Sequence, residues 1–393
     1  MRQKSMISLS ILVTMAAGCG SSTTTTPSAT TSTSTSTDSG VGKKDPTPGA
    51  NPFVPAAMEN VISQIVTAVE AKKLSSFQKP AIAVVLKDSG SFFAPIVVGA
   101  NRMSTRLGAL SIVEAPFDPN EDKTAPDALD KAAALQNSYI TSLMAGSLYK
   151  GMALAPHEAT GDSVTTLNSF VKQCGPVVTI DSDSPDSSRS YLIATSNYQA
   201  GQTAAKKLLE VVKPGESVLV FGTTLDAWAS GIERAQGAID TLTAAGTIVA
   251  PKVSPVWDPA VDTQNLITAL SDPAYNFTGM VCMYSNSFNC AAAVEALGKK
   301  DAIKIVGFDM ETDTKTYFDK GYFYGIAVQR QYYMGQMGVL VPYAINVLGV
   351  AQTAALLQPV LVNASFIDTG IDLITVDNYA AYMTFLSELG INT

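Results

Sequence analysis

Histidine, cysteine and basic side chains are scarce in this chain of 393 residues. It has one histidine, His157, and four cysteines without CxxC-type spacing, so no metal site and no disulfide scaffold is expected. Lys and Arg number 26 against 34 Asp and Glu, which gives a formal charge of −8. Nucleic-acid phosphates require clustered Lys and Arg. We therefore predict no bound metal and no nucleic-acid partner.

The first 18 residues have the pattern of a secretory signal peptide. Arg2 and Lys4 precede an apolar run that begins at Met6, and small residues stand directly before Cys19. The run is broken by serines and is shorter than the about 20 apolar residues that span a membrane. The order Ala-Ala-Gly-Cys resembles the bacterial lipobox, which implies that Cys19 becomes the lipidated first residue of the mature chain.

Residues 19–52 are expected to form a disordered tether. Ser and Thr fill nearly all of 21–39, and 40–52 adds Gly, Pro, Lys and Asp, a composition that cannot build a core. Removing Arg2 and Lys4 with the signal leaves 24 basic against 34 acidic side chains, a formal charge of −10. We expect an acidic body held by its lipid, with no basic patch that adheres to anionic headgroups.

The body reads as an α/β protein. Short apolar runs, continuous rather than alternating, are separated by amphipathic helical segments such as 127–144 and 161–173, and the pattern restarts near residue 217. Such runs are typical of parallel strands buried on both faces. We predict two doubly wound parallel-sheet, Rossmann-like lobes. No GxGxxG or GxxxxGK[ST] opens the first helix of either half, so no nucleotide cofactor is expected. The runs are 81–86, 110–113, 151–155, 176–180, 191–194, 217–221, 247–250, 279–283, 303–308 and 324–328.

Aromatic and polar side chains follow the predicted strands. Ligands of open parallel sheets bind beyond the carboxyl ends of the strands. Flat rings cover the apolar face of a small polyhydroxylated ligand, while carboxylates, amides and guanidinium groups satisfy its hydroxyls. The residues at these positions include Phe92, Phe93, His157, Asp181, Asp183, Trp228, Trp257, Asn286, Asp309 and Gln329.

Six segments carry a family resemblance: Leu86–Phe93, Thr179–Asp186, Ser230–Gly237, Cys282–Asn286, Val306–Asp309 and Ile326–Gln329. In this order along the chain they resemble the type I periplasmic-binding-protein family, specifically the sugar-binding lipoproteins of ABC transporters that include ribose-binding protein. The resemblance implies a ligand site made by Phe92, Phe93, Asp181, Arg234, Asn286, Asp309 and Gln329. The ligand would lie in the cleft between the two lobes. Trp228 and Trp257 are added to the site because their loops border this cleft.

The resemblance also implies how the body is divided. A first lobe would consist of 53–196 and 330–366, a second of 197–329 and 367–393, joined by a three-stranded hinge that closes over the ligand. The implied function is capture of a sugar or polyol for an ABC permease by a monomer, without catalytic residues or cofactors, lipid-anchored on the extracytoplasmic side of a bacterial membrane.

Two departures and several alternatives stay open at this point. Gly90 and Ser182 stand where ribose binders carry asparagine and arginine, which puts ribose in doubt. A sensory receptor for an autoinducer-like furanose or a nucleoside is an alternative, as is a secreted glycoside hydrolase with paired carboxylates. Arg234 could instead pair with Glu233 or Asp240.

Five further residues have a structural interpretation as well as, or instead of, a functional one. Asp183 competes with Asp181, which we prefer. His157 is interpreted as a cleft-edge histidine, because no GxSxG elbow supplies a nucleophile for it to activate. Cys282 and Cys290 lie across one strand-loop-helix turn in an exported protein, so a disulfide between them is an option. Cys174 would then be unpaired and buried.

Overall fold

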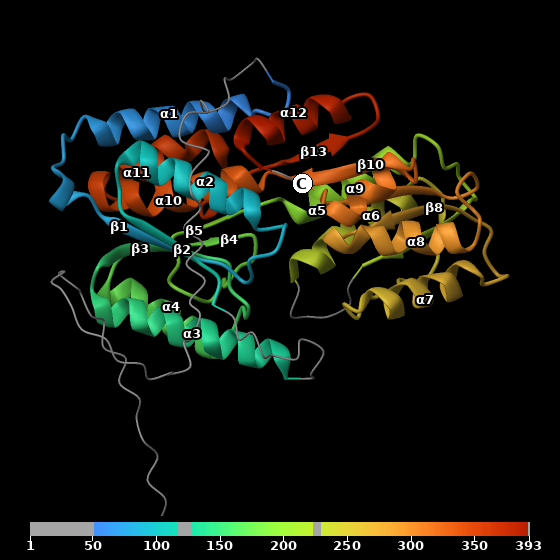
Figure 1. Ribbon diagram of the computed structural model, residues 1–393, viewed down its shortest axis with the longest axis horizontal. Helices are drawn as coiled ribbons and strands as arrows, with labels where there is room; N and C mark the ends of the chain where they lie inside the picture. Colours follow the sequence, from blue (N-terminus) through green and yellow to red (C-terminus); the bar gives the residue numbers. More distant parts are fainter. Residues whose placement is uncertain (1–50, 117–126, 223–228, 392–393) are drawn as a thin grey trace, which may run out of the picture. The chain divides into compact units, whose positions relative to one another are not determined.

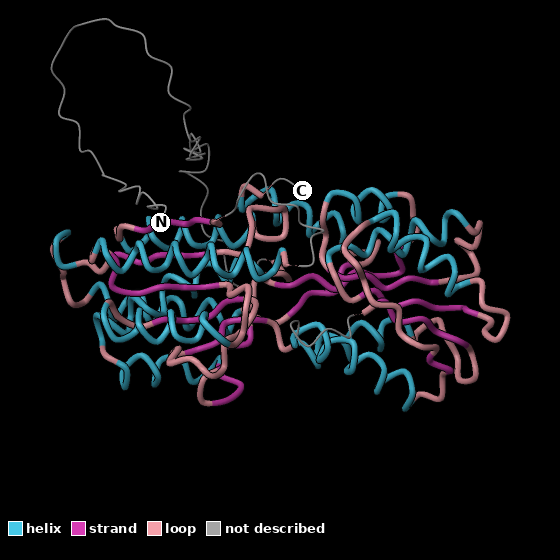
Figure 2. Tube along the Cα trace, turned by 90° about the horizontal axis from the view of Figure 1, so that it is seen from below, coloured by secondary structure: helices cyan, strands magenta, loops and turns pink. Residues whose placement is uncertain are grey.

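The computed structural model describes residues 51–116, 127–222 and 229–391. The signal peptide, Cys19, most of the tether and Trp228 lie outside this part. Within it the chain forms two mostly parallel sheets with helices on both faces of each (Figure 1 and Figure 2). The predicted fold class, two α/β lobes, is confirmed.

The first sheet has seven strands in the order β11-β12-β5-β4-β3-β1-β2. All neighbouring pairs are parallel except β11 with β12. The strands are β1 (Ala81–Val85), β2 (Ser111–Glu114), β3 (Tyr149–Leu154), β4 (Val177–Ile180), β5 (Tyr191–Ala194), β11 (Leu361–Asn363) and β12 (Phe366–Asp368). The helices of this half are α1 (Ala56–Glu70), η1 (Ser76–Gln78), α2 (Ala94–Leu107), α3 (Ala128–Gly146), α4 (Gly161–Gln173), α10 (Gln331–Leu348), α11 (Val350–Leu357) and η4 (Gln358–Val360).

The second sheet has six strands in the order β13-β10-β9-β8-β6-β7. Only β13 runs antiparallel to its neighbour. The strands are β6 (Ser217–Phe221), β7 (Ile248–Val249), β8 (Phe277–Cys282), β9 (Lys304–Phe308), β10 (Phe323–Gln329) and β13 (Ile371–Ile374). The accompanying helices are α5 (Asn197–Leu208), α6 (Ala229–Ala244), α7 (Pro259–Leu270), η3 (Ser285–Ser287), α8 (Phe288–Ala296), α9 (Thr312–Asp319) and α12 (Tyr379–Leu389).

Strand β1 shows why its sequence is apolar throughout. All five of its residues are buried. Ile82 and Val84 belong to the core that contains α1, α2 and α10, whereas Ala83 and Val85 belong to a separate core with α3 and α4. Side chains alternate between the faces of a strand, so a sheet covered on both faces needs apolar residues at every position. Full burial of each aliphatic side chain contributes about 1.5–3 kcal/mol.

The chain passes between the sheets three times, after β5, after β10 and between β12 and β13. Arg330 Nε and Nη2 donate to the two carboxylate oxygens of Asp372 at 2.9 and 2.7 Å. Asp368 Oδ1 accepts from the backbone N–H of Ser196 at 3.0 Å and of Gly370 at 2.8 Å. These bonds tie the three crossing segments to one another.

The observed crossings differ in two details from the division expected from the sequence, which assigns all of 367–393 to the second lobe. Strand β12 pairs with β5 and belongs to the first sheet. The rings of Tyr382 and Phe385 on α12 lie 5.2 and 6.0 Å from that of Phe53, and Arg102 on α2 donates to the carbonyl of Leu389 at 3.0 Å. The Tyr379 ring of α12 also lies 4.7 Å from that of Phe318 on α9. The end of the chain therefore packs on helices of both halves.

In each half two helices touch through reciprocal glycines. A Cβ on Gly99 of α2 would collide with the backbone of α10, and one on Gly335 of α10 would collide with that of α2. Gly201 of α5 and Gly237 of α6 are related in the same way. The absence of side chains at these four positions lets the backbones come into direct contact.

None of the described helices is both long and apolar enough to cross a bilayer.

Candidate ligand-binding site

The predicted site residues follow the carboxyl ends of strands in both sheets, and these two sets of loops meet. Ser91, in the loop after β1, donates through its hydroxyl to Glu311 Oε2, in the loop after β9, at 2.7 Å. The pKa of the buried Arg234 guanidinium is influenced by Asp309 of its own lobe and by Asp181 of the other. The two lobes therefore contribute polar groups to one region.

Arg234 lies on α6 and is 5% exposed. Its Nε and Nη2 donate to Asn197 Oδ1 at 3.1 and 2.7 Å, and Nη1 donates to the carbonyl of Met283 at 2.8 Å. The guanidinium carbon lies 4.1 Å from the ring centroid of Phe308, a cation–π distance. Burial lowers the pKa of Arg234, and the carboxylate of Asp309 opposes that change. Such burial does not fit a surface pair with Glu233 or Asp240.

Asp309 directly follows β9 and is 2% exposed. Gln329 Nε2, at the end of β10, donates to its two carboxylate oxygens at 3.4 and 3.2 Å. Burial raises the pKa of Asp309 to about 7, although the positive charge of Arg234 favours the ionised form. Among the described residues the hydrogen bonds to this carboxylate come from Gln329 and are 3.2 Å or longer, and further donors would lower its pKa.

Asn286 lies in the turn after β8 and carries a buried side-chain oxygen, Oδ1, with no hydrogen-bond partner among the described residues. Its Nδ2 donates to Asp262 Oδ2 at 3.4 Å. Ser287 fixes the same turn to the end of β9, since its Oγ accepts from the N–H of Phe308 at 2.8 Å. Asn286 and Asp309 follow the neighbouring parallel strands β8 and β9. Buried polar atoms usually have partners, so the unpartnered oxygen at this edge of the sheet indicates a place for a donor.

Trp257 is 42% exposed, and its ring centroid lies 5.4 Å from that of Tyr284 in an edge-to-face arrangement. Its φ of 65° is unusual for a bulky residue. Asp181 and Asp309 share this left-handed conformation, with φ of 63° and 57°. Five described non-glycine residues have positive φ, and three of them are predicted site residues. Backbone strain of about 1–3 kcal/mol per residue concentrates at functional sites.

The structure distinguishes the two aspartates after β4. Asp183 forms a two-pronged ion pair with Arg189, whose Nη2 lies 2.6 Å from Oδ2, and it also accepts from Thr179 at 2.8 Å. Asp181 Oδ2 lies 3.4 Å from Lys87 Nζ, which also contacts the Ser182 hydroxyl. Both carboxylate oxygens of Asp183 thus have partners within its own lobe. The negative charge of Asp181, by contrast, acts on the Arg234 guanidinium of the other lobe.

Phe92 and Phe93 differ in their surroundings. Phe93 is 4% exposed, belongs to the core and caps the start of α2. Phe92 is half-buried and packs edge-to-face on Phe93 with ring centroids 5.0 Å apart. Of the two, Phe92 offers a ring surface to a ligand. Phe93 holds it in place.

His157 lies near this region without the surroundings of a catalytic base. Its Nε2 is 3.0 Å from the carbonyl oxygen of Lys87, which can only accept, so Nε2 carries the proton. Burial and the Lys87 charge lower the pKa of His157. Among the described residues no cluster of three or more His, Cys, Asp or Glu side chains could hold a metal ion.

Cys282 and Cys290 form a disulfide. It joins the end of β8 to α8 and closes a loop that carries Tyr284, Asn286 and Ser287. Cys174, the free cysteine of the described ranges, is only partly buried, contrary to the expectation that it is buried, because it caps the end of α4 at the surface.

Two surface cavities lie elsewhere, one of about 580 Å³ at the amino ends of the first sheet's strands and one of about 500 Å³ among α7, α8 and α9. Neither is lined by Asp181, Arg234, Asp309 or Gln329. We place the candidate site at a polar cluster formed by Asp181, Arg234, Asp309 and Gln329. It combines a buried carboxylate and guanidinium with positive φ at Asp181 and Asp309.

Residues 82–346, more than half of the chain, match the model of the periplasmic binding protein domain. The chain belongs to the periplasmic binding protein family. This confirms the family predicted from the sequence. It also agrees with the expectation that the chain is no enzyme, since members of this family bind solutes. None of the curated protein sequences is significantly similar to it.

Solved structures of this fold come from several bacteria. An ABC transporter solute-binding protein of Burkholderia graminis in complex with D-arabinose is 24% identical, with a TM-score of 0.62 over 78% of this chain and 98% of that one. An arabinose-binding protein of Geobacillus stearothermophilus is 20% identical, with a TM-score of 0.64 over 76% and 98%. An Agrobacterium vitis protein bound with α-D-tagatopyranose is 19% identical, with a TM-score of 0.62 over 78% and 98%.

Four residues that join this binding protein's polar cluster were not among the predicted site residues. Asn197 holds Arg234, Lys87 reaches Asp181, and Ser91 contacts Glu311. Ser91 and Lys87 sit in the loop after β1, where position alone makes them candidates. Nothing in the sequence links Asn197 to Arg234, because their contact depends on how α5 packs against α6.

Proposed function

We propose that this chain captures a small sugar or polyol between its two lobes and delivers it to an ABC permease. The observation that carries the proposal is the buried Asp309 carboxyl, which lies within electrostatic reach of the buried Arg234 guanidinium and accepts hydrogen bonds of 3.2 Å or longer from Gln329. Sugar hydroxyls would donate to Asp309 and to the unpartnered Asn286 oxygen. Three of the five N–H groups of Arg234 are used by Asn197 and Met283, and the others would serve as donors to ligand oxygens.

Aromatic rings complete the proposed pocket. Phe92 from one lobe and Trp257 with Tyr284 from the other would cover the C–H faces of a sugar ring, as aromatic side chains do with flat apolar surfaces. Asp181 would accept from hydroxyls at the first lobe's side, and Gln329 would hold Asp309. Trp228, outside the described residues, and Phe93 stay predictions for this site.

The ligand class follows from chemistry and from the relatives. The polar groups of the cluster include both donors and acceptors, which suits neutral hydroxyls. Structural relatives hold D-arabinose and α-D-tagatopyranose, so pentoses and hexoses are the first candidates. The two lobes would close about the crossing segments around Arg330, and the protein would act as a monomer.

Calorimetric titration with D-arabinose, D-tagatose, other aldoses and polyols tests the proposal. We expect saturable heat with at least one sugar and no product. Asp309→Asn should weaken that binding about 10- to 100-fold, because a hydrogen bond to a charged group contributes about 1.5–3 kcal/mol. Phe92→Ala should weaken it as well. Asp240→Asn, which removes an exposed carboxylate from α6, is the matched control and should bind normally.

Unchanged affinity in both site variants would refute the pocket, and hydrolysis of a glycoside would refute the binding function.

We also propose that Cys19 carries a diacylglyceryl lipid after removal of residues 1–18, and that this lipid holds the protein on the extracytoplasmic side of the membrane. Mass spectrometry of the protein extracted from bacterial membranes should find the lipid on Cys19. A Cys19→Ser chain should lack the added mass and leave the membrane fraction. Recovery of a lipid-free wild-type chain in that fraction would contradict the anchor.

A further inference from the structure

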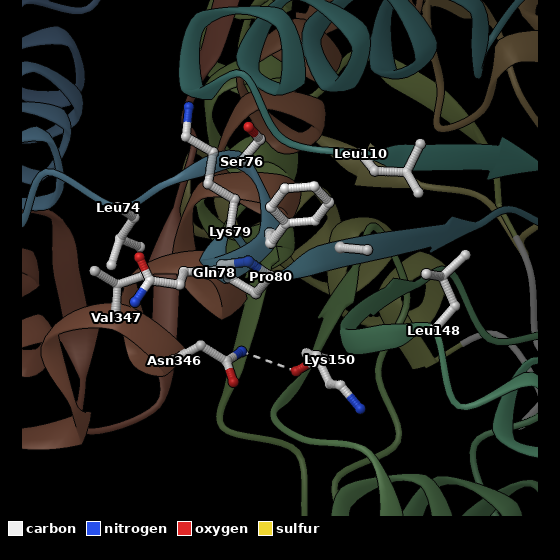
Figure 3. Close-up of a pocket in the computed structure, with 12 residues that line it drawn as sticks. Leu74, Ser76, Gln78, Lys79, Pro80, Leu110, Leu148, Lys150, Asn346 and Val347 are labelled. Carbon is white, nitrogen blue, oxygen red and sulfur yellow. Dashed lines mark hydrogen bonds between the residues drawn. The ribbon is translucent and has the colours of Figure 1, made fainter.

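A second surface lies at the opposite ends of the strands from the candidate site. Strands β3, β1 and β2 are neighbours and parallel, so the residues that begin them gather at one edge. Together they line the cavity of about 580 Å³ (Figure 3). We call this surface the basal edge, defined by Leu74, Phe77, Lys79, Leu110, Leu148 and Lys150.

Apolar side chains of the basal edge are open to solvent. Phe77, at the tip of the turn η1, is 101% exposed, and Leu110 and Leu148 are 56% and 51% exposed. Leu74 lies on the other side of the hollow from Leu110 and Leu148 (Figure 3). Single exposed leucines are ordinary, but a group of apolar side chains around one hollow with a wholly exposed phenylalanine marks an interaction surface.

The charged side chains that line the cavity are both lysines. Lys79 Nζ donates to the carbonyl of Leu107 at 2.7 Å and Lys150 Nζ to that of Ser147 at 3.0 Å. Because a carbonyl group is neutral, these hydrogen bonds do not neutralise the positive charge of either lysine. Lys72 and Lys73 immediately precede this surface and are exposed, as is Glu70 before them. With Lys79 and Lys150 these lysines outnumber Glu70 four to one, so this part of an acidic chain is locally basic. The structure thereby departs from the expectation that the body has no basic patch.

We propose that the basal edge binds a bilayer surface rich in anionic phospholipid. Lysines attract the phosphates, and Phe77 with the flanking leucines enters the boundary between headgroups and acyl chains. A second copy docked face to face would bring lysines against lysines. An anionic lipid surface complements both the charge and the apolar centre.

The chain outside the structure is long enough to allow this contact. Residues 19–50 precede the described part, and 32 residues reach up to about 110 Å when extended. Helix α1, of 15 residues, separates the start of the body from the basal edge by about 22 Å. A lipid on Cys19, which belongs to the proposed function, and the basal edge can therefore occupy one membrane at the same time.

Membrane contact at this edge has a consequence for ligand capture. The candidate site follows the carboxyl ends of the same strands whose amino ends form the basal edge. A protein resting on its basal edge therefore keeps the first lobe's ligand-binding loops away from the bilayer and open to dissolved sugar.

Co-sedimentation with vesicles tests the proposal in the full chain carrying Cys19→Ser, so that no lipid contributes. We expect stronger binding to vesicles of phosphatidylglycerol and phosphatidylcholine than to phosphatidylcholine alone. Each lysine near an anionic surface is worth about 1 kcal/mol, or about fivefold in binding. Replacing Lys72 and Lys73 with glutamine should thus weaken binding about 25-fold. The matched control replaces the exposed pair Lys299 and Lys300 in the second lobe and should change binding less than twofold.

Both pairs of variants share residues 1–50, so any membrane affinity of that segment cancels in the comparison. Equal losses from the two lysine pairs would overturn the proposal. A second readout is tryptophan fluorescence in Phe77→Trp and, as control, in Val376→Trp, which changes an exposed residue elsewhere. Brominated lipids should quench the first and spare the second, and equal quenching would overturn insertion. Sedimentation showing a dimer that Phe77→Ser dissociates would assign the surface to a second copy instead. Sugar affinity is measured separately and does not bear on these outcomes.

Discussion

Replacing Asp309 with asparagine removes an ionisable group from the centre of the candidate site while keeping its shape. Asparagine also tolerates the left-handed backbone, φ 57°, found at this position. Burial raises the pKa of Asp309 from its ordinary 3.8 to about 7. Between these two pH values the folded protein keeps a proton that the unfolded chain has lost. The ligand-free wild type should therefore lose stability as the pH rises from about 4 to about 7.

The magnitude follows from the size of that shift. One proton per molecule changes the free energy of unfolding by about 1.4 kcal/mol per pH unit, or about 4 kcal/mol over the whole window. Asp309→Asn cannot ionise, so its stability should lack this slope. Relative to the wild type, the variant gains stability between pH 4 and 7 and keeps a constant difference above pH 8.

Urea denaturation of both proteins without ligand, at half-unit steps from pH 4.5 to 8.5, measures the difference. Asp240→Asn controls for the loss of one negative charge at the surface, and its curve should run parallel to that of the wild type. Parallel curves for wild type and Asp309→Asn would refute the reasoning, because they would mean that Asp309 titrates alike in the folded and unfolded chain.

Two further variants test the disulfide after β8 and the ion pair between the crossing segments. Replacing Cys282 and Cys290 with alanine should lower the free energy of unfolding by about 2.5 kcal/mol, the loop-closure entropy of a nine-residue ring, and a denaturation midpoint equal to that of Cys174→Ala would contradict this. Arg330→Lys cannot make the two-pronged pair with Asp372 and should cost about 2 kcal/mol. The same urea denaturation measures this fall in the free energy of unfolding. A fall no larger than that caused by replacing an exposed lysine would argue against a structural role of Arg330.

Apolar runs predicted the strands well, because a strand covered on both faces has no polar position to obscure it. The runs 191–194 and 217–221 coincide with β5 and β6. No run marked β11, β12 or β13, which have three or four residues each and are only partly buried. The contacts of α12 with Phe53 and α2 of the first half, beside its contact with α9, were missed as well, since the sequence assigns the whole chain end to the second lobe.

The sequence predicted which loops carry the residues of the candidate site, but not which of those residues contact one another. Strand order brings Asp309 and Gln329 together, because β9 and β10 are neighbours. The sequence favours Asp181 over Asp183 only by resemblance, and the ion pair of Asp183 with Arg189 supplies a physical difference between them. The contact between Arg234 and Asn197 spans two helices and 37 residues, so no local pattern reveals it.

The reciprocal glycines between α5 and α6, and between α2 and α10, bear on how the protein would move. Where backbone rests on backbone, no side chain can change its rotamer to let one helix slide over the other. Each lobe is thereby stiffened against shear, and a change in the angle between lobes has to be absorbed by torsions in the three crossing segments. Arg234 and Asn197 sit beside one of these contacts, so the donors aimed at a ligand would travel with their lobe as a fixed unit.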